Sequence, residues 1–264
     1  KTAYEIPKRD WSSDVCSSDL SFKPPRDIFV YPPRWLFAPT LDNYAGLAKR
    51  WPEFFHHLAN SAIVAAGATL LAVGASALAA YAYSRWRSRA LTLTAFFMIF
   101  IRLIPPIVIT LPLFPAINAL ALNDTHLVLI LLYATFFVSL GTLVLRAFVD
   151  QIPRELDEAA MVDGASRWQI FRLVYVPLIR PAMIAVGTFA LLHAWNEYLY
   201  AFLILSHETR VTLTVTLGLF RSDDSAPWPL LMAVGIVYSI PPTVLYFSVR
   251  KYMVTGLTSG GVKD

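Results

Sequence analysis

Long runs of apolar residues alternate with short charged segments along this chain of 264 residues. An α-helix needs about 20 consecutive apolar residues to cross a lipid bilayer, and windows of that length are hard to explain in a water-soluble protein. Counting between charged residues predicts five such helices. The predicted transmembrane spans are residues 61–83, 91–113, 127–145, 182–205 and 229–249.

Two of these spans contain polar or helix-breaking residues. In the second span, the adjacent Pro105 and Pro106 are expected to kink or break the helix near its middle. Arg102 lies just before them, and ionisable residues inside a membrane usually face a cavity or a partner. Arg102 is therefore either part of a pathway through the membrane or a structural arginine bound to carbonyls that the break sets free. Polar residues at 193–197 interrupt the fourth span.

The composition agrees with a membrane protein. Hydrophobic residues make up 56% of the chain and charged residues 15%, with a mean hydropathy of +0.54, which is too apolar for one soluble core. The net charge of +4 does not indicate nucleic-acid binding, because the basic residues stand in short clusters beside apolar runs. A single cysteine, Cys16, excludes an internal disulfide, and no Cys/His pattern has the spacing of metal ligands.

Basic residues also predict the orientation, because Lys and Arg gather in cytoplasmic loops. They are frequent in the loop at 84–89, in a polar island at 150–181 and near the C-terminus, and they are absent from 115–126. The island and the C-terminus are therefore predicted to face the cytoplasm. The external arm at 21–50 conflicts with this rule, since it carries five basic residues.

The chain divides into four parts by composition. Residues 1–20 are polar, and the stretch RDWSSDVCSSDL at 9–20 resembles translated sequencing-adaptor read-through, so we expect a non-native or disordered tail there. A proline-rich external, periplasmic arm with a short helix is expected at 21–60, a transmembrane domain at 61–250 and a cytoplasmic tail at 251–264.

The polar island predicts a helix-turn-helix. Three acidic residues follow Pro153, where the helix dipole favours negative charge, so a helix should start there. It should end at Gly164, which can adopt the left-handed conformation of a helix terminus. Ser166 and Gln169 then form the capping box of a second helix, whose apolar side should end at Pro177 and Pro181, where the next span begins. From the residues alone, an amphipathic loop lying on lipid headgroups is an equally good interpretation.

The island resembles the EAA motif of the membrane subunits of bacterial ABC importers. Residues 158–177 read EAA, three residues, G, nine residues and VYVP, with the family's spacing intact and only conservative apolar departures. Other stretches are similar to the maltose-type carbohydrate permeases of that superfamily. These are SFKPP at 21–25, LDNY at 41–44, IPP at 104–106, WNEY at 195–198 and GLTSGGVKD at 256–264.

This resemblance implies an all-α membrane protein that acts as the translocation subunit of an ATP-driven carbohydrate importer in the bacterial inner membrane. The implied substrate is a sugar, an oligosaccharide or a related polyol or glycerol phosphate. The family has six spans, so the first is expected to be missing here, which would also explain the basic external arm. The implied partners are a second permease subunit, two ATPase subunits and an external solute-binding protein. ATP and Mg would be bound by the ATPases, since this chain has no phosphate-binding loop motif and would not itself be an enzyme.

The resemblance also assigns roles to residues. ATPase coupling is expected of the motif residues Glu158, Ala159, Ala160, Asp163, Gly164 and Pro177. The candidates for a substrate pathway are Arg102, Trp195, Asn196 and Glu197. For the last three, a hydrogen-bonded contact with the companion permease is an equally good explanation. The alternative functions are a stand-alone secondary transporter, which would need paired intramembrane carboxylates, and a membrane scaffold that transports nothing.

Overall fold

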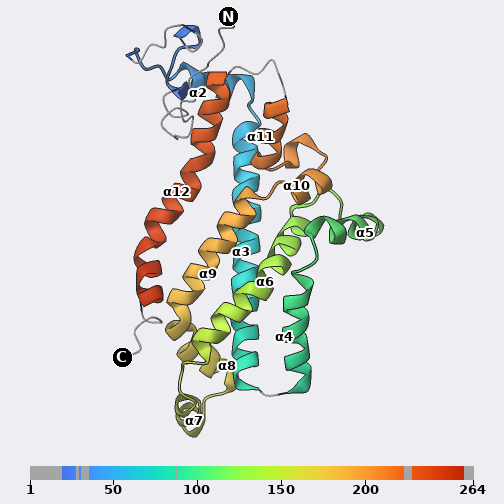
Figure 1. Ribbon diagram of the computed structural model, residues 1–264, viewed down its shortest axis with the longest axis vertical. Helices are drawn as coiled ribbons and strands as arrows, with labels where there is room; N and C mark the ends of the chain where they lie inside the picture. Colours follow the sequence, from blue (N-terminus) through green and yellow to red (C-terminus); the bar gives the residue numbers. More distant parts are fainter. Residues whose placement is uncertain (1–19, 28–29, 31–35, 87, 223–227, 259–264) are drawn as a thin grey trace, which may run out of the picture.

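The computed structural model describes residues 20–27, 30, 36–86, 88–222 and 228–258, and all of their regular secondary structure is helical (Figure 1). The predicted tail at 1–20 lies almost wholly outside these residues, as do the last residues of the C-terminal tail. The α-helices are α2 (Asp42–Arg50), α3 (Phe54–Arg85), α4 (Arg89–Ile101), α5 (Pro106–Ala119), α6 (His126–Val149), α7 (Glu155–Val162), α8 (Arg167–Ile170), α9 (Val176–Asn196), α10 (Leu199–Ile204), α11 (Leu213–Ser222) and α12 (Trp228–Thr258). Short 3-10 turns cover Pro25–Asp27 and Glu208–Arg210, and a π-helical segment covers Phe171–Tyr175.

Within the described ranges, four helices are long and apolar enough to cross a membrane, against the predicted five. They are Phe54–Arg85, His126–Val149, Arg167–Asn196 and Trp228–Arg250. The all-helical class and four of the spans are thus confirmed. The second predicted span, 91–113, is instead divided between α4 and α5, of 13 and 14 residues. Each half would be only about 20 Å long at 1.5 Å per residue.

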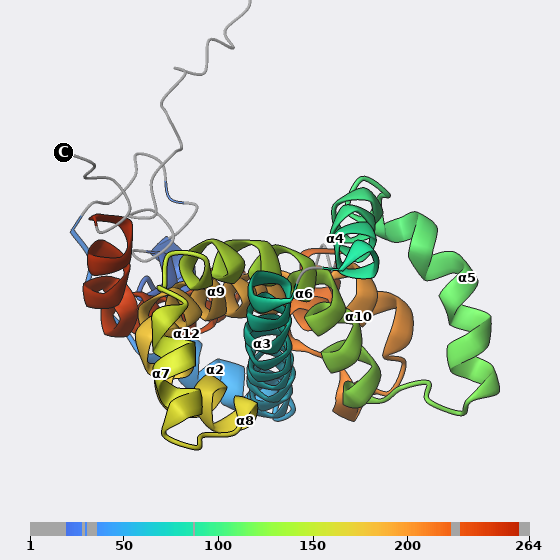
Figure 2. The same cartoon turned by 90° about the horizontal axis from the view of Figure 1, so that it is seen from below.

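The division of the second span has a local cause. A residue that precedes proline is pushed out of the helical region, and proline has no N–H to donate. Pro105 accordingly has an extended ψ of 136°, and α4 ends before it at Ile101. Viewed from below, α5 runs away from the axis of α4 rather than continuing it (Figure 2). The proline pair therefore breaks this span fully, rather than only kinking it.

The fourth predicted span, 182–205, has different bounds in the structure. The helix begins at Arg167 and ends at Asn196, and α10 is a separate short helix. The apolar side of the preceding helix was expected to end at Pro177, but the helix passes through this residue without a break. The π-helical segment explains this, because the N–H of Val176 bonds to the carbonyl of Phe171, five residues back. The wider turn precedes a proline that could donate no hydrogen bond itself.

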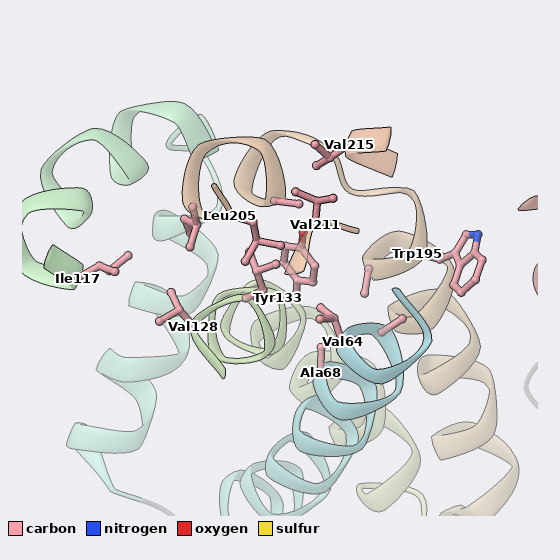
Figure 3. Packing of buried hydrophobic residues seen from close by; sticks show 14 residues of the cluster. Val64, Ala68, Ile117, Val128, Tyr133, Trp195, Leu205, Val211 and Val215 are labelled. Carbon is pink, nitrogen blue, oxygen red and sulfur yellow. The ribbon is translucent and has the colours of Figure 1, made fainter. Parts of the chain in front are cut away.

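α3 lies centrally between α6 and α9, and α12 packs on α9 (Figure 1). Small residues allow close approach at the centre of the bundle, where Gly141 of α6 faces Ser76 of α3 and Val186 of α9. Figure 3 shows the largest buried cluster, in which Val64 and Ala68 of α3 lie beside Tyr133 of α6. α7 and α8 lie at one end of the bundle, and α2 and α11 lie at the opposite end (Figure 1).

At the α2 end, the short segments are tied together by buried polar side chains. The amide of Asn43 donates to the carbonyls of Ser21 and Lys23, at 2.7 and 3.1 Å. These contacts join the SFKPP stretch to the LDNY stretch. The imidazole of His57 contacts both the carbonyl of Glu208 (2.7 Å) and the hydroxyl of Thr216 (2.8 Å). The start of α3 is thereby linked to the chain before and within α11.

Asp124 links the loop between α5 and α6 to the segment that follows α10. Its Oδ1 accepts the backbone N–H groups of Ser206 and His207, at 3.0 and 3.1 Å, and its Oδ2 lies 2.5 Å from Nδ1 of His207. Burial by itself raises the pKa of this carboxyl, but the two N–H groups and the charges of His207 and Arg210 outweigh burial. The pKa of Asp124 therefore lies below its usual value.

Candidate coupling site and polar cluster

The helix-turn-helix predicted at the polar island is present, with α7 as its first helix and α8 as the start of its second. α7 begins at Glu155, two residues after Pro153, and its first turn carries the acidic residues Glu155, Asp157 and Glu158. Negative charge at this end of a helix is stabilised by the helix dipole. The expected start of the helix is confirmed to within two residues, although Pro153 precedes the N-cap, Arg154.

The turn between α7 and α8 follows the capping signals of the sequence. Gly164 has φ +82°, a conformation that favours glycine. The N–H of Ala165 bonds to the carbonyl of Ala160 (2.9 Å) and the N–H of Gly164 to that of Met161 (3.1 Å), which is the Schellman pattern. The capping box of Ser166 and Gln169 is also formed. Both local predictions are confirmed.

The residues expected to couple to an ATPase lie mostly on the surface. α7 contains no fully buried residue. Glu158, Ala159, Asp163 and Gly164 are exposed at α7 and its C-terminal turn, whereas Ala160 is half-buried against the core. Pro177 is exposed as well, but it lies in α9, beyond the π-helical segment. Large apolar side chains beside the motif are exposed too, namely Leu156, Met161, Val162 and Trp168. The motif and its neighbours thus expose both acidic and apolar side chains at this end of the bundle, next to the exposed Arg154 and Arg167.

Arg85, at the end of α3, holds α7 in place. Its Nε lies 2.9 Å from Oδ2 of Asp157 and donates to the hydroxyl of Tyr175 at 2.6 Å. Its second guanidinium nitrogen donates to the carbonyl of Ile152 at 2.7 Å, and the guanidinium lies 4.9 Å from the ring centroid of Tyr175. The side chains of Arg85 and Asp157 are only 6% and 14% exposed. The sequence marked Arg85 only as one of the basic residues of a loop.

Glu197 is the centre of a second polar cluster, at the break between α9 and α10. The hydroxyl of Tyr133 donates to Oε2 of Glu197 at 2.5 Å. The backbone N–H of Tyr200 donates to the same carboxylate at 3.1 Å, and the hydroxyl of Thr214 donates to the backbone carbonyl of Glu197 at 2.9 Å. These bonds tie α6, α10 and α11 to the end of α9.

Trp195 and Asn196 contact α12 instead. The hydroxyl of Tyr238 donates to Oδ1 of Asn196 at 2.8 Å, and the rings of Trp195 and Tyr238 have centroids 5.7 Å apart. Trp195 is buried, and its indole nitrogen has no hydrogen-bond partner among the residues that the structure describes. Figure 3 shows Trp195 at the edge of the core cluster, on the side away from Ile117. The residues predicted as one candidate site are therefore divided, because Trp195 and Asn196 contact α12 whereas the carboxylate of Glu197 contacts α6 and α10.

An open cavity of about 720 Å³ adjoins this break. Its lining is largely aromatic, with an imidazole, an amide and a carboxylate added, and includes Phe136, Phe189, His193, Asn196, Glu197 and Tyr198. Arg102 lies beside it, with its guanidinium 5.2 Å from the ring centroid of Phe136. Phe136 in turn stacks on His193, with centroids 4.9 Å apart. Both helix breaks thus bring polar groups to one region, where aromatic faces, an amide and charged groups can bind a polar, hydroxyl-rich solute.

We also searched both clusters for metal ligands. Within the described ranges, no three His, Cys, Asp or Glu side chains come together closely enough to hold a metal ion.

In the described part of the chain, four helices of membrane-crossing length, an exposed helix-turn-helix at one end and a largely aromatic cavity at the helix breaks are the features of a multi-pass membrane protein. The comparison with known families gives the particular assignment. Residues 72–259 match the family described as the binding-protein-dependent transport system inner membrane component. The chain belongs to this family. It is a multi-pass inner-membrane permease subunit of an ABC transporter complex, and not itself an enzyme.

Individual relatives agree with this assignment. The chain is 34% identical over 244 residues to the sulfoquinovosyl glycerol transport system permease protein SmoH of Agrobacterium fabrum, covering 92% of this chain and 85% of that protein. It is 32% identical to the trehalose/maltose transport system permease protein MalG of Thermococcus litoralis, covering 89% and 85% of the two chains. It is 35% identical to the trehalose transport system permease protein SugB of Mycobacterium tuberculosis, covering 85% and 82%.

A solved structure shares the fold. It is the crystal structure of a bacterial ABC transporter involved in the import of the acidic polysaccharide alginate, with a TM-score of 0.77 and 22% identity. The match covers 89% of this chain and 88% of that one. At this identity, the likeness supports the helical arrangement alone.

Proposed function

We propose that this permease moves a sugar or a short oligosaccharide across the inner membrane at the expense of ATP hydrolysed by separate subunits. The observation that carries the proposal is the exposed helix-turn-helix with its glycine bend, at the end of the bundle predicted to be cytoplasmic. The sugar class is supported by the names of the relatives, which transport trehalose, maltose or sulfoquinovosyl glycerol. The cavity lined by aromatic rings and an amide suits such solutes.

The complex we propose contains a second permease subunit, two ATPase subunits that bind ATP and Mg, and an external solute-binding protein. α7 would enter a cleft of one ATPase, with Glu158 as a polar contact and Ala159 and Ala160 allowing close approach. Their exposure or half-burial in this chain supports that role. Asp163 and Gly164 would shape the turn, and Pro177 would lie at the start of the membrane helix that moves.

For the substrate pathway we propose the cavity at the two helix breaks. Asn196 and Glu197 line it, and Arg102 lies beside it. Trp195 would serve by holding α9 against α12 rather than by touching the sugar, since its ring packs on Tyr238. If the end of the bundle that carries α7 faces the cytoplasm, α12 also ends on the cytoplasmic side, because it runs toward that end of the bundle (Figure 1).

One experiment tests the coupling role and the sugar class together. The chain would be co-expressed with the second permease subunit, the ATPase and the binding protein of its complex, and uptake of radiolabelled trehalose, maltose and sulfoquinovosyl glycerol would be measured in proteoliposomes. We expect Gly164→Val to abolish uptake, because a β-branched residue is strained at φ +82°. Gly164→Asn is the matched control, since asparagine tolerates this conformation.

The outcomes separate the parts of the proposal. Uptake by Gly164→Val at the rate of Gly164→Asn would refute the coupling role of this turn. Failure of the chain to co-purify with any ATPase would refute the proposed assembly. Uptake of none of the three sugars by a complex that hydrolyses MgATP would refute this choice of substrates.

A further inference from the structure

α7 is attached to the bundle by the packing of Ala160 against the core and, through its charged side chains, by the cluster formed by Arg85, Asp157 and Tyr175. It buries no residue fully, and it is joined to the rest of the bundle by a loop before Glu155 and by the turn at Gly164. A helix held only by its two connections would rotate freely when pulled. The cluster instead fixes it to the end of α3 through an ion pair and hydrogen bonds.

The cluster is well placed to resist a pulling force. Tyr175 is fully buried, and its ring packs on that of Tyr81 with centroids 4.8 Å apart. Arg85 therefore binds α7 on one side and the buried core at the start of α9 on the other. A second arginine, Arg154, adds a bond to the carbonyl of Ser84 at 3.2 Å. The charges are shielded from water, so salt screens this ion pair much less than a surface pair.

α3 reaches from this cluster to the opposite end of the bundle. It has 32 residues, which correspond to roughly 48 Å at 1.5 Å per residue. Near its other end, Asn60 donates to the carbonyls of Thr209 and Val211 (3.0 and 3.1 Å), and Ser61 accepts the N–H of Leu213 (2.8 Å). A movement of α3 would thus be passed to the segment that leads into α11.

We propose that Arg85, Asp157 and Tyr175 are positioning residues that make α7 and α3 one rigid body. Force applied to α7 is then delivered to α3 directly, and not only along the chain through the turn at Gly164. The inference rests on the proposed coupling role of α7 for its purpose. The rigidity itself does not depend on what α7 touches, so the two can be tested apart.

The test measures the distance between α7 and α3 in the assembled complex. Spin labels would be placed at Val162→Cys on α7 and Leu70→Cys on α3, both strongly exposed positions, in a Cys16→Ser background. Distance distributions would be recorded without nucleotide and after trapping with MgATP and vanadate. We expect a narrow distribution with the same mean in both states, because the two helices move together.

Asp157→Asn should widen this distribution in both states and let the mean shift on trapping, since it removes the charge but keeps the size of the side chain. The matched control is Asp150→Asn, which breaks the exposed ion pair with Arg146 (3.4 Å) in the same part of the chain. The control should keep the narrow distribution, because exposed pairs contribute little.

A second variant, Tyr175→Phe, keeps the fold of the cluster and removes only one hydroxyl. It should widen the distance distribution less than Asp157→Asn does. If Asp157→Asn does not assemble into the complex, the same measurement on Tyr175→Phe tests the proposal. A narrow, wild-type distribution in every variant that assembles would overturn the proposal. So would a shift of the mean in the unmodified cluster on trapping, since α7 would then move independently of α3. The widening without nucleotide persists even if α7 meets no ATPase, which separates this inference from the coupling role.

Discussion

Replacing Gly141 by alanine should destabilise the bundle where three helices meet. A Cβ at this position of α6 would lie 2.5 Å from Oγ and 3.0 Å from Cβ of Ser76 on α3. It would also lie 3.1 Å from a methyl group of Val186 on α9. Carbon atoms pack at about 3.5 to 4.0 Å, so all three contacts are too short. Ser76 is fully buried and donates to the carbonyl of Val138, so turning its side chain away would break this hydrogen bond.

The cost follows from the way the helices must adjust. Adding one methyl group to a packed core costs about 1 to 3 kcal/mol, because neighbouring backbones have to move. We expect Gly141→Ala to lie at the upper end of this range, since two helices are displaced at once. The measurement is the thermal midpoint of the purified complex in detergent, followed by tryptophan fluorescence. The control is Gly74→Ala on α3, where no described residue lies within 4 Å of the added Cβ and alanine is the better helix former.

A compensating change makes the reasoning refutable. Ser76→Gly removes the two closest atoms, so the double variant should be more stable than the sum of the single effects, as neighbouring sites couple. If Gly141→Ala unfolds at the same midpoint as Gly74→Ala, the three helices do not approach as closely as described. If Ser76→Gly does not raise the thermal midpoint of Gly141→Ala, the contact with Ser76 is not the cause of the destabilisation.

Three further outcomes are expected. Asn43→Ala should raise the rate of tryptic cleavage within residues 20–27 several-fold. The reason is that each buried hydrogen bond that this substitution removes contributes about 1 kcal/mol. An unchanged cleavage rate would show that other contacts hold the arm. Tyr133→Phe should lower the thermal midpoint by an amount equivalent to about 1 to 2 kcal/mol, since Glu197 loses its hydroxyl donor, and an unaltered midpoint would contradict this. Asp124→Asn should destabilise the complex at neutral pH. The depressed pKa of Asp124 means that its contribution is present above the usual pKa of about 3.9 and is lost as the pH falls through the lower folded value. The difference in thermal midpoint between Asp124→Asn and wild type should therefore be constant above a pH of about 3.9 and shrink below it. A difference in thermal midpoint that does not depend on pH would refute the electrostatic explanation.

The sequence by itself determined the features that depend on a few neighbouring residues. Apolar runs between charges defined four spans, because an uncharged helix of sufficient length is required to cross lipid. The turn at Gly164 and the capping box of Ser166 and Gln169 were equally predictable, since their hydrogen bonds join groups no more than five residues apart. The match of the EAA motif then assigned the family correctly.

Only the tertiary structure decided how strongly each proline acts and which distant residues meet. Pro105 and Pro106 divide a span, whereas Pro177 lies inside a continuous helix, because a π-helical turn precedes Pro177 and no such adjustment spans the other pair. Arg85 and Tyr175 are 90 residues apart in the chain, yet they share a hydrogen bond. That contact depends on α3 packing beside the start of α9. Charge alone marked Arg85 as a loop residue, and packing made it the anchor of α7.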